Sequence, residues 1–203
     1  MTLKEINQQL NRCTKCSLRE GASQPVPGIG FPGSKYMIIG EAPGREEDEM
    51  GVPFVGMSGK RLNQLLELSR IDLNECYITN TIKCHPPSNR DPHKAELKSC
   101  VQWLMNEIAL VKPKIIITLG RIPLGLFSPY GVRQMHGTQF DYEFDELGLK
   151  VNIIAQYHPA AAFHQPTLWA VILDDWEHLP VKVDCDFTVI SLSTLEEYVN
   201  GLS

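Results

Sequence analysis

Short apolar runs alternate along this chain with stretches in which apolar residues recur at helical spacing. Four runs are rich in β-forming residues and bounded by glycine or polar residues, which predicts buried strands at residues 36–40, 76–82, 114–120 and 151–156. Leucine, isoleucine and tryptophan at helical spacing predict helices at residues 3–10, 58–70, 93–110 and 167–178. Glycine and proline mark the loops 21–35 and 83–92, and we expect 41–57 to be a long loop as well.

Apolar strands that alternate with helices predict a mostly parallel sheet that is covered on both faces. We therefore expect a three-layer α/β/α sandwich with a central sheet of four strands, formed by residues 1–180. Ligands bind such sheets at the carboxyl ends of the strands. The polar loops that begin at Glu41, at 80–83 and at 157–159 follow three of these strands. We expect them to converge on one site.

Composition narrows the class of protein. The 203 residues are 43% hydrophobic and 21% charged, which suits one globular domain with a sizeable core. No apolar window approaches a membrane span and no signal-peptide run is present, so we expect a cytoplasmic protein with reduced thiols and no membrane association. The net charge of −5 disfavours nucleic-acid binding through bulk charge but leaves a local basic groove open.

Four cysteines form two distant sets. Cys13 and Cys16 make a C-x2-C step, whereas Cys84 and Cys100 lie beyond a strand–helix–strand stretch. Soft sulfur ligands select an iron–sulfur cluster or a structural zinc ion. Ordinary core thiols or disulfides are the alternative from spacing alone.

A phosphate-binding loop is the first candidate to exclude. The sequence Met57-Ser58-Gly59-Lys60 resembles its end, but a P-loop also needs an earlier glycine and a hydroxyl residue after the lysine. Those positions hold Phe54 and Arg61. The pattern therefore disfavours nucleotide hydrolysis.

Seven short motifs follow one another between Cys13 and Trp176. They are Cys13-Thr14-Lys15-Cys16, Gly40-Glu41-Ala42-Pro43-Gly44 with Glu47-Asp48, Pro53-Phe54-Val55-Gly56 with Ser58-Gly59, Thr79-Asn80, Lys83-Cys84 with Pro86-Pro87 and Asn89-Arg90, Cys100, and His158-Pro159-Ala160. In this order, and with this cysteine spacing, they resemble the family 4 uracil-DNA glycosylases, the iron–sulfur branch of that superfamily. The resemblance implies a structural [4Fe–4S] cluster on the four cysteines, with zinc as the second choice.

The resemblance also implies a site for a flipped uracil. Phe54 would stack on the base, and the amide of Asn80 would complement its O4 and N3–H edge. His158 would donate to O2 as negative charge develops there. From the residues alone, Phe54 could equally be a core aromatic, Asn80 a turn cap and His158 a turn-shaping residue.

Two glutamates complete the implied catalytic set. Glu41 would stabilise the sugar cation or orient the attacking water. Glu47 would act as a base or fill the space that the methyl group of thymine would need, and the sequence does not divide the roles between the two glutamates. Ala42 stands where uracil glycosylases without iron have a water-positioning aspartate, and it would line the base pocket. His85 stands where the family usually has arginine, which would weaken contact with the DNA backbone locally.

Basic residues near these motifs are candidates for phosphate contact, with simple surface solvation as the alternative. They are Lys60, Arg61, Lys83, Arg90 and Arg133. No lysine is placed by a motif to form a Schiff base, so a monofunctional glycosylase is implied. No basic insertion follows Lys83, so turnover is implied and not covalent trapping.

The implied function is hydrolysis of the N-glycosidic bond of deoxyuridine in single- or double-stranded DNA, by a monomer. Residues 181–203 look like a C-terminal extension, with a strand and a capped helix at 186–199 that resemble the start of an exonuclease domain in a family A DNA polymerase. A polymerase in cis or in trans is thus an expected partner. The alternative function is a non-catalytic module that recognises uracil or DNA for such a polymerase.

Overall fold

A computed structural model describes residues 1–180 of the chain, and its centre is one twisted sheet of five strands. The strands lie side by side in the order β2-β1-β3-β5-β4. Four of them run parallel, and β4 pairs antiparallel with β5 at one edge. Their bounds are Tyr36–Gly40 for β1, Cys76–Asn80 for β2, Ile115–Leu119 for β3, Gln139–Phe144 for β4 and Leu149–Gln156 for β5.

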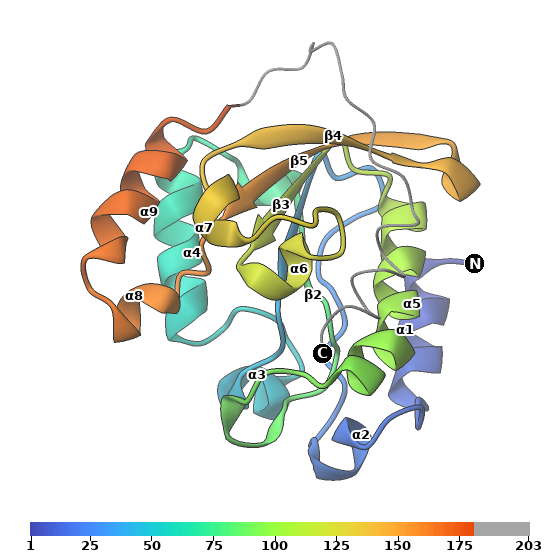
Figure 1. Ribbon diagram of the computed structural model, residues 1–203. Coiled ribbons are helices and arrows are strands. Elements are labelled where there is room, and N and C mark those ends of the chain that lie inside the picture. Colours follow the sequence, from blue (N-terminus) through green and yellow to red (C-terminus); the bar gives the residue numbers. More distant parts are fainter. Residues whose placement is uncertain (181–203) are drawn as a thin grey trace.

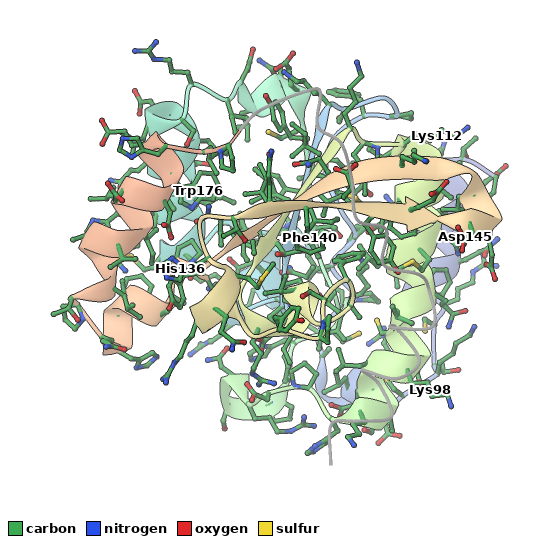
Figure 2. The ribbon with its side chains drawn as sticks, turned by 45° about the horizontal axis from the view of Figure 1, so that its top comes forward. Lys98, Lys112, His136, Phe140, Asp145 and Trp176 are labelled. Atoms are coloured by element: carbon green, nitrogen blue, oxygen red, sulfur yellow. The ribbon has the colours of Figure 1, made fainter. Side chains whose placement is uncertain are left out.

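Helices cover both faces of the sheet, which confirms the three-layer architecture (Figure 1). One face carries α1 (Leu3–Asn11) and α5 (Lys94–Val111), and the other carries α4 (Met57–Leu68) and α9 (Leu168–Glu177). Figure 2 shows Trp176 on the α9 side, and Lys98 and Lys112 near opposite ends of α5.

The alternation of side chains along β1 explains why both layers are needed. Ile38 belongs to the apolar cluster beneath α4 and α9, whereas Met37 and Ile39 belong to the cluster beneath α5. All five residues of β1 are buried. A strand buried on both faces shows a continuous apolar run, and this is the pattern found in the sequence.

The sheet has one strand more than the four predicted. β4 escapes an apolar-run criterion because it is an edge strand in which only Tyr142 and Phe144 are buried, between partly exposed polar residues. The predicted loop 41–57 also contains a helix, α3 (Arg45–Met50), whose first turn carries three acidic residues that favour a helix N-terminus.

Short helices complete the described part of the chain. They are α2 (Leu18–Gly21), α6 (Arg121–Leu124), α7 (Val132–Met135) and α8 (Ala161–His164), with 3₁₀ turns at Leu73–Glu75, Pro87–Asn89 and Asp145–Leu147. None of the helices in residues 1–180 is both long and apolar enough to cross a membrane. The strand and helix predicted at 186–199 lie outside the described residues.

Candidate active site

The predicted site loops meet at the carboxyl edge of the sheet. Gly40 at the end of β1 pairs in register with Asn80 at the end of β2, and β5 ends at Gln156, two residues before His158. The loops that leave these strands border a cavity of about 970 Å³, at the end of the sheet where α3 lies (Figure 1). Seven predicted site residues line this cavity: Glu41, Ala42, Glu47, Phe54, Asn80, Arg90 and His158.

Two glycines let Phe54 reach the end of β1. A Cβ on Gly40 would lie 2.4 Å from Asn80 Oδ1 and 2.6 Å from the Phe54 ring. A Cβ on Gly59 would lie 1.7 Å from the carbonyl oxygen of Phe54. Phe54 itself has a φ of 57°, a left-handed conformation that is uncommon for a bulky residue. The backbone is thus shaped to bring an aromatic ring over the first strand.

Asn80 presents an amide to the cavity without a partner for its oxygen. The residue is 2% exposed, and its Oδ1 has no hydrogen-bond partner among the described residues. A buried acceptor that is left unpaired costs free energy. Such an atom at the wall of a cavity is suited to accept a hydrogen bond from a ligand.

His158 is held as a neutral hydrogen-bond donor. The backbone N–H of Ala160 donates to its Nδ1 at 3.1 Å, so the ring proton resides on Nε2. Burial lowers the pKa of His158 to about 4, which keeps the imidazole uncharged near neutral pH. Its ring centroid lies 6.0 Å from that of Phe54, with the planes inclined at 31°.

The two glutamates occupy different environments. The pKa of Glu41 is raised to about 7, mainly by burial and also by the negative charge of Asp91, while Arg121 opposes the shift. Glu47 is buried, and its Oε1 accepts the backbone N–H of Gly56 at 2.8 Å. Glu41 is therefore the carboxyl group poised to titrate, and Glu47 also fastens α3 to the loop that carries Phe54.

One protein family matches the part of the chain that forms this site. The model of the uracil DNA glycosylase superfamily matches residues 27–178, which include both glutamates, Phe54, Asn80 and His158. This chain belongs to that superfamily.

Relatives of this superfamily member extend the likeness beyond the matched segment. The type-4 uracil-DNA glycosylase of Saccharolobus solfataricus is 39% identical over 181 residues, covering 84% of this chain and 82% of that protein. The type-4 enzyme of Sulfurisphaera tokodaii is 36% identical over 185 residues, covering 88% and 83%. A DNA polymerase of Bacillus phage SP01 is 27% identical over 165 residues, which cover 80% of this chain and 17% of the polymerase.

One predicted DNA contact of this glycosylase-superfamily chain is wrong. The Lys83 side chain is 0% exposed, and its Nζ lies 2.6 Å from Glu107 Oε2 inside the protein. A buried and paired ammonium cannot reach a phosphate. The prediction for Lys83 failed because a lysine in a polar loop is usually solvated.

The other basic candidates lie at or near the surface. Lys60 and Arg133 are exposed. Arg90 lines the cavity and pairs with Glu96 through two hydrogen bonds of 2.7 and 2.9 Å. Arg61 donates to the carbonyl oxygen of Pro159 at 3.0 Å, beside His158. Phosphate contact by these four residues stays a prediction.

Sequence reasoning missed contacts that brace the site. The guanidinium of Arg61 stacks on the rings of Phe163 and Trp169, at 3.8 and 4.6 Å from their centroids. His85 Nδ1 lies 2.9 Å from the carbonyl oxygen of Pro43, which ties the proline-rich loop to the loop after β1. Arg61, which was expected to contact DNA, and His85, which was expected to weaken DNA contact, thus hold loops of the site in place.

The four cysteines singled out by spacing also come together. Cys84 and Cys100 belong to one buried cluster, and Cys13 and Cys16 pack against it. Burial raises the pKa of Cys84 to about 12, and the thiols of Cys100 and Cys16 add to the shift. Within residues 1–180, no group of three or more His, Cys, Asp or Glu side chains is arranged to hold a metal ion as it stands. What the fold supplies is a set of four neighbouring soft donors.

Proposed function

We propose that this chain is a monofunctional uracil-DNA glycosylase, which hydrolyses the bond between uracil and deoxyribose and leaves an abasic site for base excision repair. One observation carries the proposal: the unpaired amide oxygen of Asn80, the ring of Phe54 and the neutral imidazole of His158 line a single cavity. Membership of the superfamily and the type-4 relatives support it.

Recognition of uracil follows from the donor and acceptor pattern of the base. Asn80 Oδ1 accepts from N3–H, while its amide nitrogen donates to O4. Cytosine presents the opposite order at both positions, so the same amide orientation rejects it. The ring of Phe54 stacks on the flipped base, which compensates part of the few kcal/mol that unstacking costs.

The reaction needs charge stabilisation on both sides of the breaking bond. The electron pair of the C1′–N1 bond leaves with uracil, and the charge that develops at O2 is stabilised by Nε2–H of His158. The carboxylate of Glu41 stabilises the cationic sugar. Water adds to C1′, and the proton that it loses balances the protonation of the uracil anion, so the products are neutral uracil and deoxyribose with a hydroxyl group on C1′. No lysine is among the described residues that line the cavity, which supports a reaction without a Schiff base.

A [4Fe–4S] cluster is the cofactor that suits the cysteine quartet. Cys13, Cys16, Cys84 and Cys100 would hold it, since thiolates are the usual ligands of such clusters. When bound, it supplies a covalent tie between the N-terminal arm and the proline-rich loop, and the reducing cytoplasm we expect for this protein keeps the thiols available.

DNA that contains uracil is the proposed partner, in single- or double-stranded form, and the protein is proposed to act as a monomer. Lys60 and Arg133 are exposed and free to approach phosphates, with Arg61 and Arg90 beside the cavity. A polymerase, in cis or in trans, is proposed as a second partner; this part of the proposal starts from the 27% identity to a segment of a phage DNA polymerase.

The decisive experiment is a cleavage assay on oligonucleotides with one uracil, single-stranded or paired with G or A. We expect alkali-labile abasic sites and released uracil, and intact strands when alkali is omitted. Strand cleavage without alkali would contradict monofunctional action. Binding of uracil DNA without any release of the base would instead favour the alternative, a non-catalytic recognition module attached to a polymerase.

The identity of the metal centre has its own test. An iron–sulfur cluster gives visible charge-transfer absorbance in protein that is purified anaerobically, whereas zinc has no redox or d-electron transitions and gives a colourless protein. A colourless protein that contains one zinc ion would exclude the cluster.

A further inference from the structure

A fully buried ion pair lies directly behind Asn80. The side chains of Lys83 and Glu107 are both 0% exposed, and their charged atoms are 2.6 Å apart. Lys83 Nζ also donates to the carbonyl oxygen of Asn80 at 2.9 Å and to Thr79 Oγ1 at 2.5 Å. An ammonium has three protons, so these three acceptors satisfy it completely.

Glu107 completes a closed polar network. Its Oε2 accepts from Thr79 as well as from Lys83, and its Oε1 accepts the backbone N–H of Gly28 at 3.1 Å. Burial and the nearby charge of Glu107 raise the pKa of Tyr77. A buried ion pair is weak evidence for stability, because desolvation offsets the attraction between the charges. Its better-attested use is to select one local arrangement.

The arrangement selected here is that of the main chain at Asn80. The Asn80 side chain has no hydrogen bond at Oδ1 to orient it, so its direction depends on the backbone beneath it. On the far side, the backbone of Lys83 is itself fixed, because its N–H donates to Cys100 Sγ at 3.3 Å and its carbonyl accepts from Val26 at 2.6 Å.

We propose that Lys83, held by Glu107, is a positioning residue for base recognition: its ammonium fixes the end of β2 so that the Asn80 amide meets uracil in one orientation. The proposal rests on the proposed glycosylase function. Lys83 would also link the cysteine cluster to the base pocket. Its backbone N–H contacts the thiol of Cys100, and its side chain contacts the carbonyl group of Asn80.

A double-mutant cycle with Asn80 tests this role. Removing one charge alone would leave the other buried without a partner, so the main variant is Lys83→Met with Glu107→Gln. We expect kcat/KM on uracil DNA to fall about 10- to 100-fold, as for a small misplacement of a reacting group. In an Asn80→Ala background the same pair of changes should alter kcat/KM by less than about twofold.

A second pair of substitutions allows the test even if the methionine variant does not fold. Lys83→Gln with Glu107→Gln keeps a donor that can reach the Asn80 carbonyl, so we expect a smaller loss with the same dependence on Asn80. This pair replaces the methionine variant in the cycle if that variant does not fold.

The matched control is Lys150→Met, which removes a lysine that is 65% exposed and pairs with Glu143 at 3.3 Å. It should leave the rate within about twofold of the unmodified protein.

Hydrogen exchange gives a readout that needs no activity. We expect peptides covering residues 79–84 to exchange faster in the methionine variant, with those covering β3 unchanged. Equal losses of rate in both Asn80 backgrounds would reveal a general structural role and overturn the proposal. Unchanged exchange at 79–84 would overturn it as well. If the unmodified protein releases no uracil, the glycosylase function fails, while the exchange data alone decide whether Lys83 fixes the end of β2.

Discussion

Burial acts in opposite directions on His158 and Glu41. Removing a group from water penalises its charged form, so the pKa of the imidazole falls to about 4 and that of the carboxyl rises to about 7. At neutral pH the histidine is therefore an uncharged donor, and the glutamate is partly ionised. Two residues beside one cavity thus acquire distinct chemical roles from the same physical cause.

The pH dependence of the rate should report Glu41. Its carboxylate is the form that stabilises a sugar cation, so kcat/KM should rise with pH up to about 7 and then level off. Well below that value it should fall about tenfold per pH unit. His158 is neutral throughout this range, because its pKa lies near 4. Steady-state measurements of kcat/KM between pH 5 and pH 9, at about equal ionic strength, test this rise with pH, which forms the acidic limb of the profile.

The matched variant for this profile is Glu41→Gln, which cannot ionise. It should be slower at neutral pH and should lose the limb near pH 7. A limb that persists in this variant would assign the titration to another group.

His158→Ala removes the proposed donor to uracil O2. We expect single-turnover cleavage to slow by about 100-fold or more, which corresponds to about 2.7 kcal/mol of transition-state stabilisation. His178→Ala is the control, since that side chain is 70% exposed at the end of α9. A similar loss in both variants would contradict a specific role for His158.

At the scale of elements, the site depends on how the segment between α3 and α4 crosses the end of β1. Glu47 on α3 binds the backbone of Gly56, and Gly59 in the first turn of α4 makes room for the carbonyl group of Phe54. These contacts hold Phe54 in a left-handed conformation that bulky residues avoid. Packing between short elements therefore presents the aromatic ring.

Gly59→Ala should disrupt this crossing. The new Cβ would lie 1.7 Å from a backbone oxygen, which no side-chain movement can relieve. We expect about 1–3 kcal/mol of destabilisation, by analogy with overpacking, together with a lower kcat/KM because Phe54 is displaced. Chemical denaturation and steady-state kinetics measure the two effects.

Gly21→Ala is the matched control for that change. Gly21 lies in α2, and a Cβ there would meet nothing within 4 Å. Its stability and rate should be those of the unmodified protein or slightly better. A Gly59→Ala variant that behaves in the same way would show that the loop tolerates the methyl group.

At the scale of the whole molecule, the apolar core of residues 1–180 consists of three clusters. Two of them pack α4 with α9 and α5 against the sheet, and the third joins α1 to the start of α5 around the cysteines. The cysteines thus lie where the N-terminal arm meets the loop after β2. An iron–sulfur cluster bound by these cysteines would stabilise the fold and would not take part in the chemistry at the cavity.

Cys13→Ala should therefore affect folding before it affects catalysis. We expect less visible absorbance per protein and a lower yield of folded protein, since ligation of a metal centre is coupled to folding. Cys76→Ala is the control, because Cys76 is a buried cysteine in β2 that lies outside the third cluster, whereas Cys13 is partly buried and packs against it. Full absorbance in the Cys13→Ala protein would exclude this residue as a ligand.

The layers, the loops that border the cavity and part of its lining were predictable from the sequence. Buried parallel strands have a continuous apolar pattern, and the polar residues that follow them must gather at one edge of the sheet. The strands that end at Gly40 and Asn80 were therefore recognisable as continuous apolar runs. β4 was missed by that criterion, because an edge strand alternates aromatic with polar residues and has no such run.

The surroundings of the charged residues, in contrast, could be seen only in the folded protein. Lys83 and Arg61 have the same character in the sequence, but one is sealed inside the protein against Glu107 and the other clamps the loop of His158. Likewise, the tautomer of His158 depends on a single backbone N–H, and the pKa of Glu41 depends on its burial. Electrostatic behaviour is set by desolvation and by partners that are distant in sequence, and these exist only once the chain has folded.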